Sequence, residues 1–317
     1  MAELSPASRP KLAYPIRIGS RGSPLALAQA RELVRRLEKA HGLSEQNFAI
    51  VPIKTSGDKI LNQPLDEAGG KGLFTKELDL ALLGGDIEIA VHSAKDLPAY
   101  LPEGIEIAGY LPREDARDVW ISPHAPHPRK LPAGSVVGTA SLRRAALVRR
   151  LRPDLSIALL RGNVETRLEK VARGEIAATL LALAGLKRLG LQSKATAVLD
   201  AEEFVPAPGQ GAIVMTARSG DNGALRFLAP VADQATSIAL CAERAFLRVL
   251  EGSCKTPIGA HARMEGDTLA FVAIVLRPDG SQFFETAVSG PAGDAVRLGE
   301  MAAKALLAQI PAGFFAP

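Results

Sequence analysis

The chain has 317 residues, a formal net charge of +4, 47% hydrophobic residues and 23% charged residues, which is typical of a soluble globular protein of two or three domains. Its two cysteines provide neither a disulfide framework nor metal-ligand spacing, so we expect a cytoplasmic protein without a metal. No run of about 18 apolar residues predicts a membrane span. Residues 1–13 lack the apolar core of a signal peptide, and we expect them to form a disordered tail.

Two parts of the chain repeat one pattern of strands and helices. An apolar strand, a hydroxyl-bearing turn and a run of helical periodicity occur at 14–38 and again at 135–151. Each unit continues with a second strand, a glycine-containing turn, another helix and an apolar strand, at 48–91 and at 155–183. Strands that alternate with helices predict parallel α/β sheets, and the repeat predicts two similar lobes.

The chain is expected to cross between these lobes twice and then to enter a third unit. The crossings are predicted in two segments that contain proline and glycine, 101–113 and 205–211, followed by a strand at 212–217 that rejoins the first lobe. Helices at 235–250 and 294–309, with strands between them, predict a small α+β domain. We therefore divide the chain into a tail (1–13), lobe 1 (14–111 and 212–230), lobe 2 (112–211) and a C-terminal domain (231–317).

Hydroxyl groups and arginines gather where strands lead into helices. Ser23 is a good helix N-cap with Pro24 at the first helical position, and Ser141 lies at the matching place in the second unit. Such capping needs no ligand. Three arginines lie within three residues of these serines in the sequence: Arg21, Arg143 and Arg144. Guanidinium groups are not needed for capping, but they suit bidentate binding of carboxylates.

The basic residues are unevenly distributed along the chain. Residues 143–188 contain nine Arg and two Lys against four acidic residues, a local excess of +7. This excess indicates an anionic partner, either nucleic acid or small polycarboxylates or phosphates. Aromatic residues make up only 4% of the chain, which gives little support to the stacking surfaces used by single-strand binders.

Two further segments are candidates for chemistry. Ser93, Lys95 and Asp96 follow an apolar strand, at the edge where α/β proteins build their sites, and could bind an anion and place one carboxylate for proton transfer or cation stabilisation. A solvated charged loop is the alternative, and His92 is expected to be a hydrogen-bonded structural residue. The glycine-rich segment 68–74 lacks the full phosphate-loop pattern, so a mobile lid or substrate loop is as reasonable.

The two cysteines differ in their surroundings. Cys254 lies in a loop of Gly, Ser and Pro and is followed by Lys255, whose charge would favour the thiolate. It is therefore either a reactive or modified thiol or an ordinary loop thiol. Cys241 lies among apolar residues and is expected to be a small buried hydrophobic side chain.

Taken together, these motifs resemble the porphobilinogen deaminase family, also called hydroxymethylbilane synthases. The resemblance covers about residues 16–310, in order, and its matching runs are 69–74, 90–96, 138–144, 160–168, 208–212 and the loop around Cys254. It implies an α/β fold of two periplasmic-binding-protein-like lobes with mixed sheets, plus a C-terminal domain with a three-stranded sheet and helices. It also implies a cytoplasmic monomer without nucleic-acid or membrane partners.

The resemblance further implies a cofactor and a reaction. Cys254 would carry a dipyrromethane through a thioether, and four porphobilinogen molecules would be added to this primer with loss of ammonia before the linear tetrapyrrole is released by hydrolysis. Asp96 would be the catalytic carboxylate. Loss of ammonia leaves an electron-poor azafulvene-like cation, which a fixed carboxylate can stabilise.

Each pyrrole unit brings an acetate and a propionate, which gives the basic residues a purpose. By resemblance, the cofactor-binding residues are Cys254, Ser93, Lys95, Thr139, Ser141, Arg143, Arg144, Arg161, Gly162, Arg167 and Arg188. The substrate-binding residues would be Arg21, Ser23, Lys71 and Gln210.

Two alternatives from other classes are a non-catalytic binding protein for an anionic metabolite and a nucleic-acid binder. The first would explain the lobes and the arginines but not the third domain with its thiol. The second would leave Asp96 and Cys254 without a role.

Overall fold

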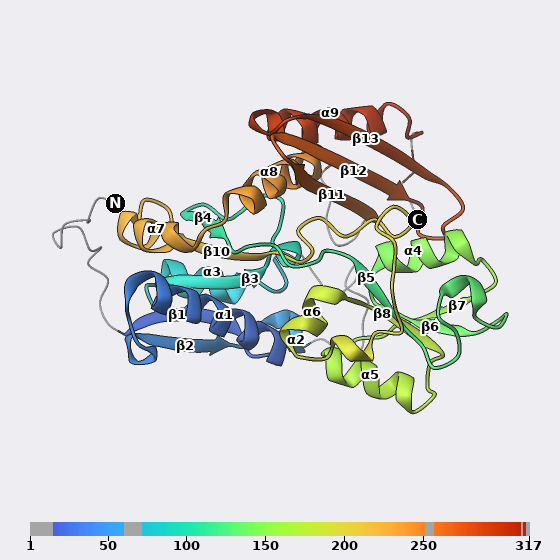
Figure 1. The fold of residues 1–317 in the computed structure, drawn as a ribbon, viewed down its shortest axis with the longest axis horizontal. Coiled ribbons are helices and arrows are strands. Elements are labelled where there is room, and N and C mark those ends of the chain that lie inside the picture. The colour runs from blue at the N-terminus through green and yellow to red at the C-terminus, as the bar shows by residue number, and fades with distance from the viewer. Residues whose placement is uncertain (1–14, 60–71, 251–256, 312, 315–317) are drawn as a thin grey trace.

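The computed structural model describes residues 15–59, 72–250, 257–311 and 313–314. Within these residues the chain forms three separate sheets, two of five strands and one of three strands. Figure 1 shows the sheets of the two lobes side by side, with the third sheet and its helices above them. The predicted class, an α/β protein with two lobes of mixed sheets and a C-terminal α+β unit, is confirmed.

Lobe 1 is built around a sheet with the strand order β2-β1-β3-β10-β4. The first three strands are parallel, whereas β10 runs antiparallel to both of its neighbours. The strands are β1 Ile16–Arg21, β2 Phe48–Ile53, β3 Ile89–Ser93, β4 Ile105–Tyr110 and β10 Ile213–Arg218. The helices are α1 Pro24–His41, α2 Ser56–Lys59, α3 Lys76–Leu83 and α7 Asn222–Leu228.

Lobe 2 repeats this arrangement with the strand order β7-β6-β8-β5-β9. Again three strands are parallel and the fourth, β5, runs antiparallel to β8. The strands are β5 Asp118–Ile121, β6 Val136–Gly138, β7 Ser156–Ala158, β8 Ala178–Ala182 and β9 Ala197–Val198, and the helices are α4 Leu142–Leu151, α5 Val164–Ala172 and α6 Leu183–Arg188. The strands that follow the two crossings, β5 and β10, therefore make both sheets mixed, as the resemblance implied, because each enters its sheet from the opposite direction.

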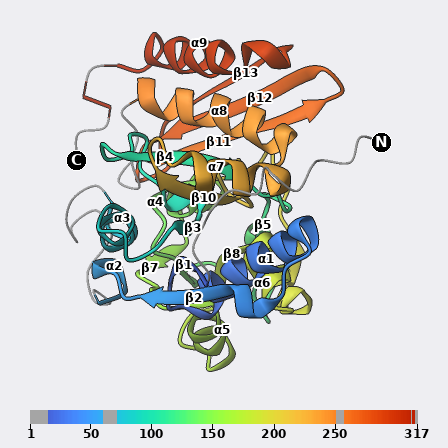
Figure 2. The ribbon, with the colours of Figure 1, turned by 90° about the vertical axis from the view of Figure 1, so that its left-hand side faces the viewer.

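The C-terminal unit is an antiparallel sheet in the order β11-β12-β13. Its elements are α8 Gln234–Val249, β11 Ile258–Glu265, β12 Thr268–Leu276, β13 Phe283–Pro291 and α9 Ala295–Leu307. Apolar side chains of both helices and of the sheet form one core that also includes Tyr110 and Val214 of lobe 1. Figure 2 shows the unit stacked on lobe 1, with α9 at its outer end. Short 3₁₀ turns complete the described chain: η2 Glu45–Asn47, η3 Ala94–Asp96, η4 Pro128–Lys130, η5 Gln192–Lys194, η6 Ala229–Val231 and η7 Ala292–Asp294.

The predicted helix starts are confirmed by their capping hydrogen bonds. The Ser23 hydroxyl accepts a hydrogen bond from the Ala26 backbone N–H, and Pro24 opens α1. The Ser141 hydroxyl accepts one from the Arg144 N–H, and α4 spans the predicted residues. None of the helices in the described part of the chain is both long and apolar enough to cross a membrane.

The expectation for Cys241 was wrong, because this cysteine is exposed. It lies on α8 between Leu240 and Ala242, which are buried in the core. Successive residues of a helix point about 100° apart, so a five-residue apolar run cannot lie on one face. Its neighbours take the buried face and leave the thiol outside.

Candidate active site

Asp96 lies where the lobe 1 sheet ends, in the turn η3 that directly follows β3. Its carboxylate is 3.6 Å from an Nη of Arg21, the last residue of β1, and about a quarter of its side chain is exposed (28%). Since β1 and β3 are parallel neighbours, their carboxyl ends bring these two residues to one edge.

Arg21 is held from two further sides. Its guanidinium pairs with Asp58 and lies over the ring of Phe74, 4.2 Å from the ring centroid. Burial would raise the pKa of Asp58, but its bonds to Arg21 and Thr55 outweigh burial and lower it. Arg21 is therefore fixed beside Asp96 by contacts that need no ligand.

A small cavity of about 90 Å³ adjoins Asp96. It brings together five of the predicted site residues on lobe 1: Arg21, Ser23, Ser93, Lys95 and Asp96. Gln29 of α1 lies in the same wall and donates a hydrogen bond to the Ser93 hydroxyl at 2.9 Å. The predicted structural role of His92 is confirmed, since its Nε2 is 3.3 Å from the Thr216 hydroxyl and burial lowers its pKa to about 4.

The return crossing packs directly onto the turn that carries Asp96. Gly209 and Gly211 both have positive φ, and a Cβ at Gly209 would lie 2.7 Å from the backbone nitrogen of Lys95. A Cβ at Gly211 would lie 2.3 Å from the Glu114 carbonyl oxygen. Glycine is therefore required at both places, and the close approach delivers Gln210 between them to the site.

Gln210 links lobe 1 to a buried charge cluster in lobe 2. Its amide oxygen is 3.3 Å from the Lys95 ammonium, and its amide nitrogen donates to Asp118 at 2.8 Å. Burial, and next the charge of Arg144, lower the pKa of Lys95 to about 8. A lysine in such surroundings gains from any added negative charge.

The paired arginines of α4 both bind Asp118. Arg143 and Arg144 each lie 2.7 Å from one of its carboxylate oxygens, and all three side chains are buried. Burial alone would raise the pKa of Asp118, but the two guanidinium groups outweigh it and hold that pKa far below its usual range. Each arginine also donates to a backbone carbonyl, of Val205 and of Leu180 respectively.

These contacts bear on the prediction that Arg143 and Arg144 bind ligand carboxylates. Both are only 4–5% exposed, so neither presents a free guanidinium to solvent. The Nε of Arg143 is buried without a hydrogen-bond partner among the described residues. Two guanidiniums against one carboxylate leave a net positive charge beside Lys95. Their binding of ligand carboxylates remains a prediction.

Arg167 is the basic residue best placed to accept a new carboxylate. Its Nε donates to the Gly162 carbonyl at 3.0 Å, and no carboxylate of the described chain lies within salt-bridge distance. Burial, and next the charges of Arg144 and Arg161, lower the pKa of Arg167 to about 10, while Asp96 acts in the opposite direction. The charge of Asp96 in lobe 1 therefore acts on Arg167 in lobe 2, although the two groups form no salt bridge.

The other predicted residues have local or inter-lobe roles in the structure. Thr139 is buried, and its hydroxyl accepts a hydrogen bond from the Ser141 N–H at 3.1 Å. Arg188 donates to Glu32 of α1 at 3.1 Å and to the Gly211 carbonyl at 3.0 Å, so it ties lobe 2 to lobe 1. Cys254 and Lys71 lie outside the described residues.

Sequence reasoning missed two buried acids. Asp118 opens β5, and Glu243 of α8 binds Arg113 at 2.6 Å as well as the backbone N–H groups of Gly209 and Ala262. Glu243 thereby joins both crossings to the C-terminal sheet. The burial of Glu243 could have been predicted, because it is an acid on an otherwise apolar face of a helix. Nothing in the sequence, however, pairs Asp118 with arginines 25 and 26 residues away.

The residues present fit a polycarboxylate such as a dipyrromethane. Two observations support this fit. Positive charge is in surplus around Asp118, and the Arg167 guanidinium forms no salt bridge with a carboxylate of the described residues. Both would be relieved by ligand carboxylates.

The fold and this geometry define a two-lobed α/β protein whose lobes meet at a cationic site for an anionic ligand. Family models agree. Residues 16–226 match "Porphobilinogen deaminase, dipyromethane cofactor binding domain", and residues 237–308 match "Porphobilinogen deaminase, C-terminal domain".

Curated relatives extend over nearly the whole chain. A porphobilinogen deaminase of Nitrobacter winogradskyi is 54% identical and one of Nitrobacter hamburgensis is 53% identical, each over 298 residues that cover 94% of both chains. Among solved structures, the periplasmic VFT2 domain of Bordetella pertussis BvgS aligns with a TM-score of 0.40 and 14% identity, covering 73% of this chain and 91% of that one. The chain belongs to the porphobilinogen deaminase family.

Proposed function

We propose that Asp96 is the catalytic carboxylate of this porphobilinogen deaminase and that the cations around it hold the carboxylates of primer and substrate. The activity is the head-to-tail joining of four porphobilinogen molecules, with loss of ammonia, and release of the linear hydroxymethylbilane. The observation that carries the assignment is the position of Asp96, at the end of β3 in a cavity with Arg21, Ser93 and Lys95.

Asp96 is suited to stabilise positive charge. Its carboxylate is partly exposed at the cavity and has Arg21 at 3.6 Å, which keeps it oriented. When ammonia leaves the aminomethyl group of porphobilinogen, the pyrrole becomes cationic, and a fixed carboxylate lowers the energy of that charge. The same oxygen atoms can accept the proton released as each new carbon–carbon bond forms.

The basic residues are suited to bind carboxylates. We assign this role first to Arg167 and Lys95, because burial lowers the pKa of both and a ligand carboxylate would offset that effect. Arg143 and Arg144 are buried against Asp118 and contribute the surplus positive charge. When bound, the dipyrromethane supplies the pyrrole carbon to which the first substrate is joined. We propose that Cys254 anchors it and that Lys71 and Gln210 contact substrate.

Four features of the organisation and location belong to the same proposal. We propose the domain division given above. We also propose a monomer, since one chain supplies all the described residues around Asp96. We propose that it has no nucleic-acid partner, since the paired arginines are buried. We also propose a cytoplasmic location, because a reducing compartment keeps the anchoring thiol available.

Asp96→Asn tests the central assignment. The amide keeps the shape but removes the charge, so we expect turnover of porphobilinogen to fall by about 10²-fold or more. Asp58→Asn is the matched control, because it also removes a carboxylate from Arg21 but leaves Asp96 in place. Equal turnover in wild type and Asp96→Asn would refute the catalytic role.

The same proteins are weighed intact under denaturing conditions. Wild type and Asp96→Asn should both carry a covalent adduct of dipyrromethane mass, whereas Cys254→Ala should carry none and be inactive. An unmodified but active wild-type protein would disprove the anchoring role of Cys254 without affecting the result for Asp96.

A further inference from the structure

A second, larger cavity lies in lobe 1 between α3 and the segment that follows Asp96. Its volume is about 360 Å³, within the range of small-molecule sites. It shares no described lining residue with the cavity beside Asp96. Most of its wall is apolar and comes from Leu80, Leu83, Pro98, Leu101 and Pro102. None of its described lining residues is among those assigned to the Asp96 site.

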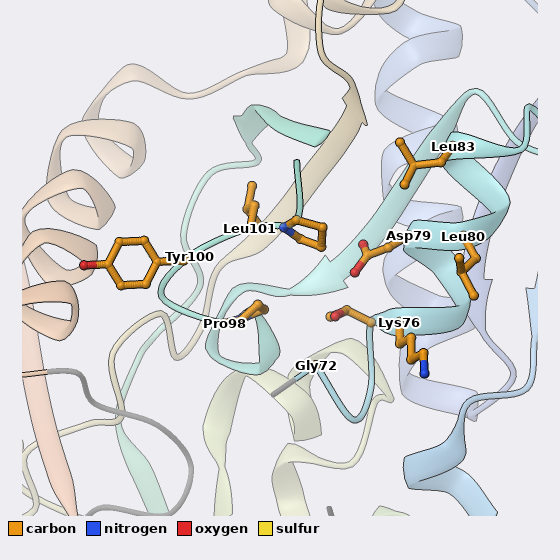
Figure 3. A pocket seen from close by; sticks show the side chains of 10 residues that line it. Gly72, Lys76, Asp79, Leu80, Leu83, Pro98, Tyr100 and Leu101 are labelled. Carbon is orange, nitrogen blue, oxygen red and sulfur yellow. The ribbon is translucent and has the colours of Figure 1, made fainter. Parts of the chain in front are cut away.

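Among its described lining residues the wall contains one buried carboxylate. Asp79 of α3 is 7% exposed, and no salt bridge links it to another described residue. Figure 3 shows its carboxylate turned toward the segment with Pro98 and Leu101, whereas the Lys76 side chain points away from that segment. Burial raises the pKa of Asp79, since the charged form has no cationic partner to offset its desolvation.

A buried hydroxyl lies beside this carboxylate. Thr75 is 2% exposed, and its Oγ1 has no hydrogen-bond partner of standard geometry within the described chain. It lies close enough to Asp79 to oppose the rise of the carboxyl pKa. The hydroxyl therefore offsets only part of the burial of the carboxylate, and a cationic donor from a ligand would stabilise the charged form on this wall of the cavity.

We propose that this cavity binds an amphipathic organic amine, with its ammonium on Asp79 and Thr75 and its apolar body against Leu80, Leu83 and Leu101. A protonated amine supplies what the wall lacks, a positive charge with several N–H donors. The carboxylates of porphobilinogen do not fit, because the wall already contains a carboxylate and its only described ammonium points outward. Porphobilinogen also carries an aminomethyl group, so the proposed ligand differs from it in being an amine without carboxylates.

The test is titration calorimetry on the full chain with two matched probes, 2-phenylethylammonium and its neutral counterpart 2-phenylethanol. We expect the ammonium probe to bind with a dissociation constant on the order of 1 mM. The neutral probe should bind about tenfold more weakly, since it cannot form the charge-assisted hydrogen bond.

Two variants and a control locate the interaction. Asp79→Asn should weaken the ammonium probe about tenfold and leave the neutral probe unchanged. Asp86→Asn removes an exposed negative charge just beyond α3 and should change neither. Leu83→Trp, at a position 46% exposed, should reduce binding of both probes by adding bulk to the wall.

Equal affinity of the two probes, or equal weakening by Asp79→Asn and Asp86→Asn, would overturn the proposal, as would the absence of binding to wild type. These readouts measure binding alone. They are therefore independent of whether Asp96 is the catalytic residue.

Discussion

Asp118 and Glu243, two carboxylates with no solvent exposure, differ in how their charge is compensated. Both side chains are fully buried and both hold arginines. Glu243 pairs with one arginine, Arg113, so the charge of the pair is balanced. Its carboxylate oxygens also accept hydrogen bonds from two backbone N–H groups. Asp118 faces two arginines and an amide, so its cluster retains a positive charge.

This difference predicts that the Glu243 pair is structural and that the Asp118 cluster serves ligand binding. Burial of an uncompensated charge costs several kcal/mol, so a surplus is expected only where another group will offset it. The balanced pair lies where both crossings meet the C-terminal sheet. The unbalanced cluster lies behind Lys95, on the side of the Asp96 site. Loss of either carboxylate should therefore destabilise the protein, but only loss of Asp118 should affect ligand binding strongly.

The largest effect is expected for Asp118→Asn. The substitution leaves Arg143 and Arg144 buried without a counter-charge, which should lower the free energy of unfolding by about 3 kcal/mol. Because the two arginines can then move, turnover of the folded enzyme should fall by about 10²-fold. The measurements are porphobilinogen consumption and urea denaturation. Asp115→Asn, three residues earlier and paired with the more exposed Arg117, is the control and should change both little. Full activity of Asp118→Asn would show that the cluster serves the fold alone.

For Glu243→Gln we expect a loss of stability with little loss of activity. Removing the charge breaks the buried pair with Arg113, which should cost about 3 kcal/mol in urea denaturation. Turnover per folded molecule should stay within about twofold of wild type. Glu265→Gln, at an exposed pair with Arg263 in the same domain, should cost less than about 1 kcal/mol. A fall in turnover as large as that of Asp118→Asn would remove the distinction between the two centres.

The pH dependence of stability provides a second test of the Glu243→Gln variant. Burial alone would raise the pKa of Glu243, but Arg113 and His261 outweigh it and lower the pKa from 4.5 to about 2. A lowered folded-state pKa stabilises the protein fully above the unfolded value, and this contribution is lost as the pH falls from about 4.5 toward 2. Glu243→Gln should lack this part of the acid destabilisation.

The sequence predicted local features well and distant pairings poorly. The caps at Ser23 and Ser141 depend on residues three positions apart, so they are visible in a short window. The Asp118 cluster joins strand β5 to helix α4 and to the return crossing, and its partners become known only when the sheet order is known. The exposure of Cys241 likewise depends on which face of α8 packs inward.

Arg188, predicted to bind the cofactor, pairs with Glu32 of the other lobe, and the cofactor-binding role stays a prediction. Its side chain is 9% exposed, so the pair is screened less than the i,i+4 pair that Glu32 forms with Arg36. A double-mutant cycle with Arg188→Gln and Glu32→Gln should give a coupling of about 1 kcal/mol in the free energy of unfolding, against about 0.3–0.5 kcal/mol for the cycle with Arg36→Gln. Equal couplings would mean that Arg188 contributes no more than a surface pair to the contact between lobes, and its assignment as a cofactor-binding residue would then be the stronger explanation for its position.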